Sequence, residues 1–284
     1  MRNGLIGGAA LAALTALAAC SSPEEMGEDV GVAIAETASI ASASAQAVPD
    51  APKPVAEGAF RFEDTEEEGG AQRRFLYTWP KQVAAIPALA EVLEEERTAQ
   101  LTEQQELWAD MGASCPPDSA SCRTATYEAE WSVVADTDRF LSLSSSIYTY
   151  TGGAHGNFGR GSIIWDREAG RSIDPVQFFT SPAALDDAIG DRACAMLNKE
   201  REERRGEPVP VVATDWPNQC VDIAEAVIFL GSSSGAKFDR IGVYYGPYVA
   251  GPYAEGDYEL TLPVSAAILE AVEPAYRDAF APAK

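Results

Sequence analysis

The chain begins with a short cationic start, Met1 to Asn3, and an apolar run from Gly4 to Ala19. A basic n-region, a short apolar h-region and small residues before a cleavage point make up a secretory signal peptide. The alternative is a membrane anchor, but a spanning helix needs about 20 predominantly apolar residues, and this Gly- and Ala-rich run is shorter. We therefore predict that residues 1–19 are removed and that the rest folds outside the cytoplasm, where disulfide bonds form and persist.

A cysteine follows the small residues directly, in the order Leu17-Ala18-Ala19-Cys20. This order is typical of bacterial lipoprotein signals, in which the cysteine becomes the acylated first residue. We predict that Cys20 is lipidated and that the lipid is the only membrane contact, since each buried acyl methylene contributes about 0.8 kcal/mol. Ser21, rather than Asp, after this cysteine favours the outer membrane, facing the periplasm, in a host that has one.

Residues 20–58 are rich in Ala, Ser, Glu and Pro and lack aromatic residues. Such a segment cannot bury enough apolar surface to offset the entropy lost on ordering, so we predict a disordered tether. About 225 residues follow, enough for one large domain or two small ones. We place an N-terminal α+β subdomain at 59–125 and a C-terminal domain at 126–284.

The net charge is −23, and the chain contains a single histidine. A strongly acidic chain repels nucleic acid, so we expect no nucleic-acid partner. The charge favours a cationic protein partner, although a solvated acidic surface explains the same composition.

Four cysteines remain after Cys20: Cys115, Cys122, Cys194 and Cys220. They allow three pairings in an oxidising compartment. We favour Cys115 with Cys122 and Cys194 with Cys220, and expect a structural role for both bonds. The absence of a C-x-x-C pair gives no support for a zinc ribbon or a thioredoxin-type site.

Hydrophobic periodicity and turn residues predict an α+β fold with antiparallel sheets, packed helices and room for two small subdomains. The first long helix is expected to bury Ile86, Leu89, Leu93, Leu107 and Met111, with Glu91, Glu94, Glu95 and Gln104 opposite. The second is expected to begin at the N-cap Ser181 with Pro182 and to end at Gly206. Strands are predicted at 73–79, 126–135, 139–151, 161–166, 226–230, 240–245 and 258–262, and helices at 82–111, 182–205 and 264–272.

Two sequence motifs resemble those of hydrolases. Gly231 to Gly235 satisfies G-x-S-x-G, but a strand-like segment follows it and the only histidine lies upstream, so we predict a polar hairpin loop. Ser234 to Lys237 satisfies S-x-x-K without the accompanying K-T-G and S-D-N elements. A carboxylate pair for glycan hydrolysis stays open, because its diagnostic is a distance in space. We therefore assign no catalytic residue, metal ligand or cofactor.

The segment Tyr150-Thr-Gly152-Gly153-Ala-His155-Gly156-Asn157 follows an aromatic strand, and its glycines indicate positive φ angles in a fixed loop. A tight connection with a hydrogen-bonded His155 is the simplest interpretation. The octapeptide resembles the hallmark of the extracellular domain shared by RsiV-type anti-sigma factors and PdaC-type peptidoglycan deacetylases. The resemblance continues at Trp165-Asp166 with Gly170, at Ile173 to Phe179, at Tyr244 to Gly256 and at Glu259 to Pro263. It covers residues 126–263, and the segment from Phe60 is similar to the family's preceding small domain.

The resemblance implies an α+β envelope domain that, in one branch, binds lysozyme directly. The sequence shows neither an anti-sigma segment nor the catalytic deacetylase domain, and one histidine could not supply that domain's metal site. We therefore expect a non-catalytic binding module for a cationic protein such as lysozyme, or for cell-wall fragments. The alternatives are a wall glycan hydrolase using paired carboxylates and a structural lipoprotein. The predicted contact surface combines the loop residues Tyr150, Gly152, Gly153, His155, Gly156 and Asn157 with the tyrosines Tyr245, Tyr248 and Tyr253.

Overall fold

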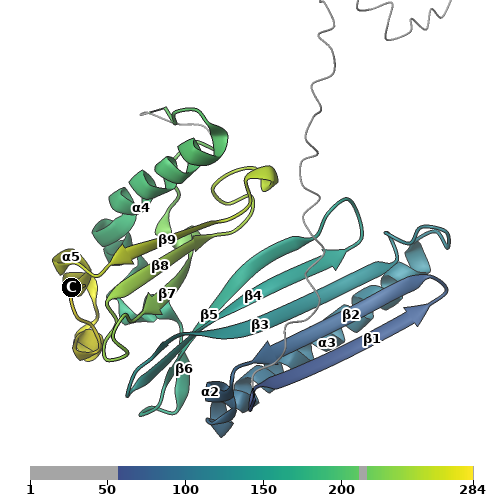
Figure 1. The fold of residues 1–284 in the computed structure, drawn as a ribbon, viewed down its shortest axis with the longest axis horizontal. Helices are drawn as coiled ribbons and strands as arrows, with labels where there is room; N and C mark the ends of the chain where they lie inside the picture. Colours follow the sequence, from purple (N-terminus) through teal and green to yellow (C-terminus); the bar gives the residue numbers. More distant parts are fainter. Residues whose placement is uncertain (1–56, 211–215, 284) are drawn as a thin grey trace, which may run out of the picture. The chain divides into compact units, whose positions relative to one another are not determined.

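The computed structural model describes residues 57–210 and 216–283. The signal peptide, Cys20 and nearly all of the tether lie outside the described residues. The expected α+β class is confirmed, with one six-stranded and one three-stranded sheet in this part of the chain (Figure 1). No helix among the described residues is long and apolar enough to cross a membrane.

The first sheet begins with the antiparallel strands β1 (Phe60–Glu68) and β2 (Ala71–Trp79). Gly69 and Gly70, both with positive φ, make the tight turn between them. The helices α2 (Lys81–Ala84) and α3 (Pro87–Ser114) follow. The predicted helix at 82–111 is therefore divided, because Pro87 lacks the N–H that would continue the first turn and instead takes the first position of α3.

After α3 the chain returns as β3 (Thr124–Asp136), which pairs with β2 in parallel. Among the strands of the described residues, this is the one pair that departs from the predicted antiparallel pairing. A parallel pair needs a long crossover, and α3 supplies it. The antiparallel strands β4 (Phe140–Thr151), β5 (Asn157–Asp166) and β6 (Arg171–Ile173) complete the sheet in the order β1-β2-β3-β4-β5-β6.

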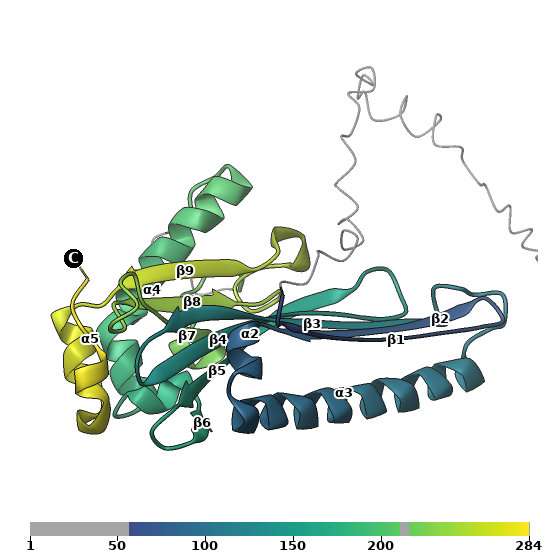
Figure 2. The same ribbon diagram turned by 60° about the horizontal axis from the view of Figure 1, so that its bottom comes forward.

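Helix α3 covers one face of this sheet (Figure 2). Leu89 and Leu93 are fully buried there, as predicted. Leu107, in contrast, is exposed, and Gln104 is buried. The reason is Arg73, a buried sheet residue that faces this part of α3 and donates to the Gln104 side-chain oxygen at 3.4 Å. A buried guanidinium requires hydrogen-bond acceptors, so the buried stripe of α3 becomes polar at this point.

The second sheet consists of β7 (Val227–Gly231), β8 (Arg240–Tyr245) and β9 (Tyr258–Pro263), all antiparallel. The motif Gly231–Gly235 begins at the last residue of β7 and continues into the loop 232–239 that joins β7 to β8, so the polar hairpin predicted for this hydrolase-like motif is confirmed. In this loop Ser233 hydrogen-bonds to Asp239 through both its backbone N–H and its hydroxyl.

Helix α4 (Pro182–Arg205) packs against the second sheet. Its predicted caps are confirmed: the Ser181 hydroxyl accepts from the Ala184 N–H at 3.0 Å, and Gly206 is left-handed with φ 73°. The last α-helix, α5 (Ala266–Ala271), begins after Ser265 and is shorter than expected. Short 3-10 turns span Pro175–Phe178, Ile223–Glu225, Tyr253–Glu255 and Pro274–Ala279.

Two hydrophobic cores lie on opposite faces of the six-stranded sheet. One lies beneath α3. The other joins Phe140 of β4 to Phe178, Phe238 and residues of the second sheet and α4. Both sheets belong to one compact unit, Pro54–Lys284, and the six-stranded sheet has strands on each side of residue 125. The division at 125/126 stays a prediction.

Both favoured disulfides are present. Cys115–Cys122 joins the end of α3 to the segment before β3, and Cys194–Cys220 joins α4 to the segment that leads into the second sheet.

Candidate functional site

The hairpin between β4 and β5 contains most of the predicted site. Gly152 and Gly153 have φ angles of 85° and 95°, which confirms the positive values expected of them. Only glycine adopts such angles without a steric cost. The strand β5 starts at Asn157, four positions before the predicted start, so the loop between β4 and β5 is only residues 152–156.

His155 and Tyr253 form the centre of the site, although they lie in loops that connect strands of different sheets. Their rings stack with centroids 3.8 Å apart and an interplanar angle of 20°. The Tyr253 hydroxyl donates to the Gly156 carbonyl at 2.6 Å, and His155 Nδ1 lies 2.8 Å from the same oxygen. A carbonyl oxygen only accepts, so this contact places a proton on Nδ1. The hairpin and the loop between β8 and β9, residues 246–257, are therefore held together by stacking and hydrogen bonds.

Three further aromatic residues surround this pair: Tyr148, Phe158 and Tyr248. The Tyr148 ring lies against Gly156, where an added Cβ would collide with the Tyr148 ring and hydroxyl oxygen. Phe158 and Tyr248 lie 6.0 and 5.6 Å from the Tyr253 ring. We call these five residues, Tyr148, His155, Phe158, Tyr248 and Tyr253, the aromatic cluster.

Tyr248 is the most conspicuous member of the aromatic cluster. It has 54 % of its surface exposed, and its φ is 68°, the only positive value at a non-glycine residue in the part of the chain described. A bulky residue in the left-handed region costs about 1–3 kcal/mol, and such strain concentrates at functional sites. The turn thus holds a large ring in solvent at an energetic cost.

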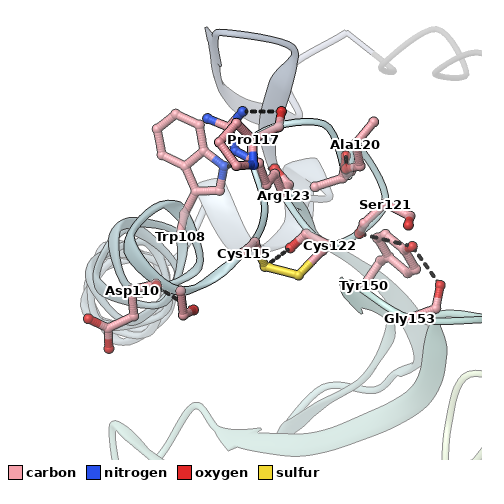
Figure 3. Close-up of a disulfide and its surroundings, with 12 residues drawn as sticks. Trp108, Asp110, Cys115, Pro117, Ala120, Ser121, Cys122, Arg123, Tyr150 and Gly153 are labelled. Atoms are coloured by element: carbon pink, nitrogen blue, oxygen red, sulfur yellow. Dashed lines mark hydrogen bonds between the residues drawn. A yellow bond between two sulfur atoms is a disulfide. The ribbon is translucent and has the colours of Figure 1, made fainter.

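The hairpin also rests on the loop closed by Cys115–Cys122 (Figure 3). The Tyr150 hydroxyl lies 3.3 Å from the Ser121 carbonyl and 2.9 Å from the Gly153 carbonyl, and donates to them. An added Cβ on Gly152 would lie 3.2 Å from that Ser121 oxygen and 3.4 Å from the Cys122 backbone. Tyr150 therefore supports the hairpin from the side and is not part of the aromatic cluster.

Arginines at the end of α4 hold the other loop. Arg201 is fully buried, and its Nε and Nη2 donate to the Ala250 carbonyl at 3.0 and 2.6 Å. Arg204 donates to the carbonyls of Glu255 and Asp257. Sequence reasoning assigned these arginines to the end of the helix alone; their side chains also fix the loop that carries Tyr248 and Tyr253.

Arg205 and Glu255 complete this attachment. The Glu255 carboxylate accepts from Arg205 Nε and Nη2 at 2.8 and 2.9 Å, and from the Tyr258 hydroxyl at 2.5 Å. Burial opposes the ionisation of Glu255, but the hydrogen bonds from Arg205 and Tyr258 outweigh it and lower the pKa of this carboxyl below its ordinary 4.5. Glu255 is thus a charged anchor of the loop.

This depressed pKa predicts a pH dependence of stability. The stabilisation by Glu255 is complete at neutral pH and is lost as the pH falls through the ordinary carboxyl range towards the lowered folded-state pKa. Glu255→Gln should therefore destabilise the chain at about pH 7, and this deficit should shrink as the pH is lowered towards about 3, as measured by urea unfolding. The exposed Glu203→Gln serves as the control and should change little at either pH. An equal deficit of Glu255→Gln at both pH values would contradict the assignment.

Tyr148 and Tyr253 of the aromatic cluster keep their hydroxyl protons at neutral pH, because the pKa of each is raised. Burial, and then the neighbouring Tyr253, raise the pKa of Tyr148; burial, and then Tyr248, raise that of Tyr253. Beside them, Arg160 on β5 pairs with Glu259 on β9 at 3.2 Å. The site therefore presents aromatic rings with protonated hydroxyls close to the Arg160–Glu259 ion pair.

One predicted contact residue does not lie at this surface. Tyr245 is fully buried, with its hydroxyl donating to the Val221 carbonyl at 3.4 Å. It belongs to the core beneath the second sheet, because consecutive strand residues point to opposite sides and the side of Tyr245 faces the core. Asn157 is exposed at the start of β5. Sequence reasoning missed Tyr148 and Phe158; the two-residue spacing of Tyr148 and Tyr150 was the available signal for the first.

The positions of two buried carboxyls bear on the alternative of a catalytic carboxylate pair. Burial raises the pKa values of Glu96 and Glu128, as an acid catalyst requires. Glu96 interacts with Tyr77 and Tyr127 on the α3 side of the sheet, whereas Glu128, the next residue after Tyr127, points to the other side. These two carboxyls therefore cannot act on one substrate. Within 57–210 and 216–283 no group of three or more His, Cys, Asp or Glu side chains is arranged to hold a metal ion.

Residues 76–158 match the family model described as Deacetylase PdaC. The chain carries a PdaC-like region. The match includes the octapeptide Tyr150–Asn157 and confirms the resemblance drawn from it, while the later blocks at 165–179 and 244–263 lie beyond the matched residues. No match was found among curated proteins.

Two solved structures are similar to this chain. A DUF3298 family protein from Pseudomonas aeruginosa is 21 % identical, with 83 % of this chain and 99 % of that chain covered and a TM-score of 0.48. A member of the same family from Bacteroides fragilis is 16 % identical, with coverages of 75 % and 91 % and a TM-score of 0.44.

Proposed function

We propose that this PdaC-like chain is a non-catalytic binding module of the cell envelope and that the aromatic cluster contacts its ligand. The observation that carries the proposal is the exposed, strained Tyr248 ring beside the stacked His155 and Tyr253. Rigid tyrosines contribute large contact areas at low entropic cost and offer one polar group each. Because both supporting loops are fixed from outside the cluster, little ordering is required when a ligand binds.

The partner we propose is a cationic protein such as lysozyme. The net charge of −23 creates a field that accelerates the approach of a cationic protein. Contacts at the aromatic cluster would then supply specificity, since buried aromatic residues dominate the free energy of many protein interfaces. Secretion and lipidation at Cys20 belong to the same proposal, because they would place the module where it meets such a partner.

Calorimetric titration of residues 21–284 with lysozyme tests this function. We expect binding that persists from about 50 to about 200 mM salt, because contacts within a buried interface are screened far less than exposed charges. Tyr248→Ala should weaken binding by about 10- to 100-fold. Trp216→Ala, which removes an aromatic residue that is 50 % exposed outside the cluster, is the matched control and should leave the Kd unchanged.

Three results would oppose the proposal. Binding that disappears at the higher salt concentration would mean that opposite charges attract without a specific interface. Equal affinities of Tyr248→Ala and wild type would place the contact elsewhere. No binding to lysozyme, combined with Tyr248-dependent binding to soluble wall fragments, would assign the site to a glycan instead.

A further inference from the structure

The hairpin that presents His155 has a covalently closed support. The Tyr150 hydroxyl and Gly152 both contact the backbone at Ser121 and Cys122. Cys122 in turn is bonded to Cys115, the residue after the last turn of α3 (Figure 3). The disulfide therefore links the end of a long, packed helix to the surface on which the hairpin lies.

The loop inside this disulfide is short and largely exposed, and apart from Tyr150 its hydrogen bonds are made within its own turn and to Arg123 and Thr124. Pro116, Pro117, Asp118, Ala120 and Ser121 are exposed, and both cysteines are half-buried. Arg123, just outside the ring, donates to the carbonyls of Pro117 at 3.1 Å and Gly69 at 3.0 Å. Without the sulfur–sulfur bond, Cys122 would lose its direct cross-link to the end of α3, and Ser121 would be held by the backbone and by the hydrogen bonds of its own turn.

The other disulfide lies elsewhere in the fold. Cys194–Cys220 joins α4 to the segment before the second sheet. In the β4–β5 hairpin, Tyr150 and Gly152 contact Ser121 and Cys122, which belong to the loop closed by Cys115–Cys122. The two bonds are therefore separable by mutation.

We propose that Cys115–Cys122 is a redox modification site that controls how the aromatic cluster is presented, an inference that rests on the function proposed above. A dithiol reductant is the co-reactant. One of its thiolates attacks a disulfide sulfur, its second thiol then releases the mixed disulfide, and two electrons and two protons pass to the cysteines. The Cys115–Cys122 bond breaks, two thiols form, and the reductant becomes a disulfide. The hairpin then loses the fixed Ser121 carbonyl, and His155 leaves its stacked position on Tyr253.

His155 is the single histidine of the chain, so its imidazole NMR signals report on this hairpin alone. The experiment uses residues 21–284 carrying Cys194→Ser and Cys220→Ser, in which Cys115–Cys122 is the one remaining disulfide. In the oxidised form, stacking on Tyr253 should displace the His155 ring-proton signals from those of a free histidine. Dithiothreitol should move them towards the free values, and reoxidation should restore them. The Kd for lysozyme should rise about tenfold on reduction, since a loop that must be ordered on binding lowers affinity.

Two further variants make the outcome decisive. Tyr150→Phe removes the hydroxyl that meets Ser121 and should shift the His155 signals in the same direction with the disulfide intact. The chain with Cys115→Ser and Cys122→Ser should show the shifted signals from the start and no response to dithiothreitol. If the His155 signals stay unchanged when alkylation and mass measurement show both thiols to be free, the proposal is overturned, whatever lysozyme does. If the signals move as expected but lysozyme never binds, the redox control stands and the proposed partner fails.

Discussion

Arg201→Met should lower the free energy of unfolding by about 2–4 kcal/mol, because the buried Ala250 carbonyl loses both of its guanidinium donors and each unsatisfied group costs about 1–3 kcal/mol. The Arg201 Nη1 hydrogen bond to the Gln219 carbonyl, at 2.9 Å, is lost as well. Methionine fills much of the same volume, so a cavity contributes little. Urea unfolding followed by circular dichroism measures the change as a lower midpoint at constant slope.

Lys199→Met is the matched control on the same helix. The Lys199 side chain is 77 % exposed and pairs with an exposed glutamate, Glu203, at 3.4 Å. Exposed pairs contribute little, so we expect a change within about 0.5 kcal/mol. Equal midpoints for the Arg201 and Lys199 variants would show that the guanidinium does not hold the loop. The positioning of Tyr248 and Tyr253 would then need another explanation.

Phe140→Ala should cost about 3–5 kcal/mol, the range for truncating a buried phenylalanine. Phe140 is buried, and its ring lies 5.2 Å from Phe178 and 5.8 Å from Phe238. Its neighbour on β4, Leu141, points to the opposite face and belongs to the core beneath α3. One strand thus contributes to both cores, and we expect them to unfold together.

Two probes test this coupling. Far-UV circular dichroism follows the whole chain, and tryptophan fluorescence follows chiefly the buried Trp79, Trp131 and Trp165 in the core beneath α3. Both midpoints should fall equally in Phe140→Ala. A fluorescence midpoint that stays in place while the dichroism midpoint falls would instead show that the two cores unfold independently of each other. Leu107→Ala, at a leucine that is 38 % exposed, should leave both midpoints nearly unchanged.

The aromatic cluster shows why the candidate site was only partly predictable. The glycines of the hairpin and the nearby tyrosines stand out in the sequence, and the structure brings His155, Tyr248 and Tyr253 together. The bond between Tyr253 and Gly156, however, joins positions 97 residues apart. No local sequence feature distinguishes Tyr245, which is buried, from Tyr248, which is exposed. Tyr245 is buried because the second core covers its side of β8, whereas Tyr248 lies in the loop after that strand.

Local chemistry was enough for the elements whose ends have their own signals. Ser181, Pro182 and Gly206 determined the bounds of α4, because capping hydrogen bonds and backbone angles depend on the residues at the helix ends. The close spacing of Cys115 and Cys122 likewise favoured the pairing that the structure contains. The α+β class followed from the same periodicity and turn residues.

Only the tertiary structure decided what depends on distant partners. Strand β1 was not predicted, because its second half is acidic and it is defined by its pairing with β2. The parallel pairing of β2 with β3 depends on where α3 returns the chain. The arginines at the end of α4 looked like ordinary helix-end charges, yet they hold a loop about 50 residues further along. Caps and turns are fixed by neighbours in the chain, whereas burial, sheet partners and long-range hydrogen bonds are fixed by which surfaces meet, and a single sequence does not state this.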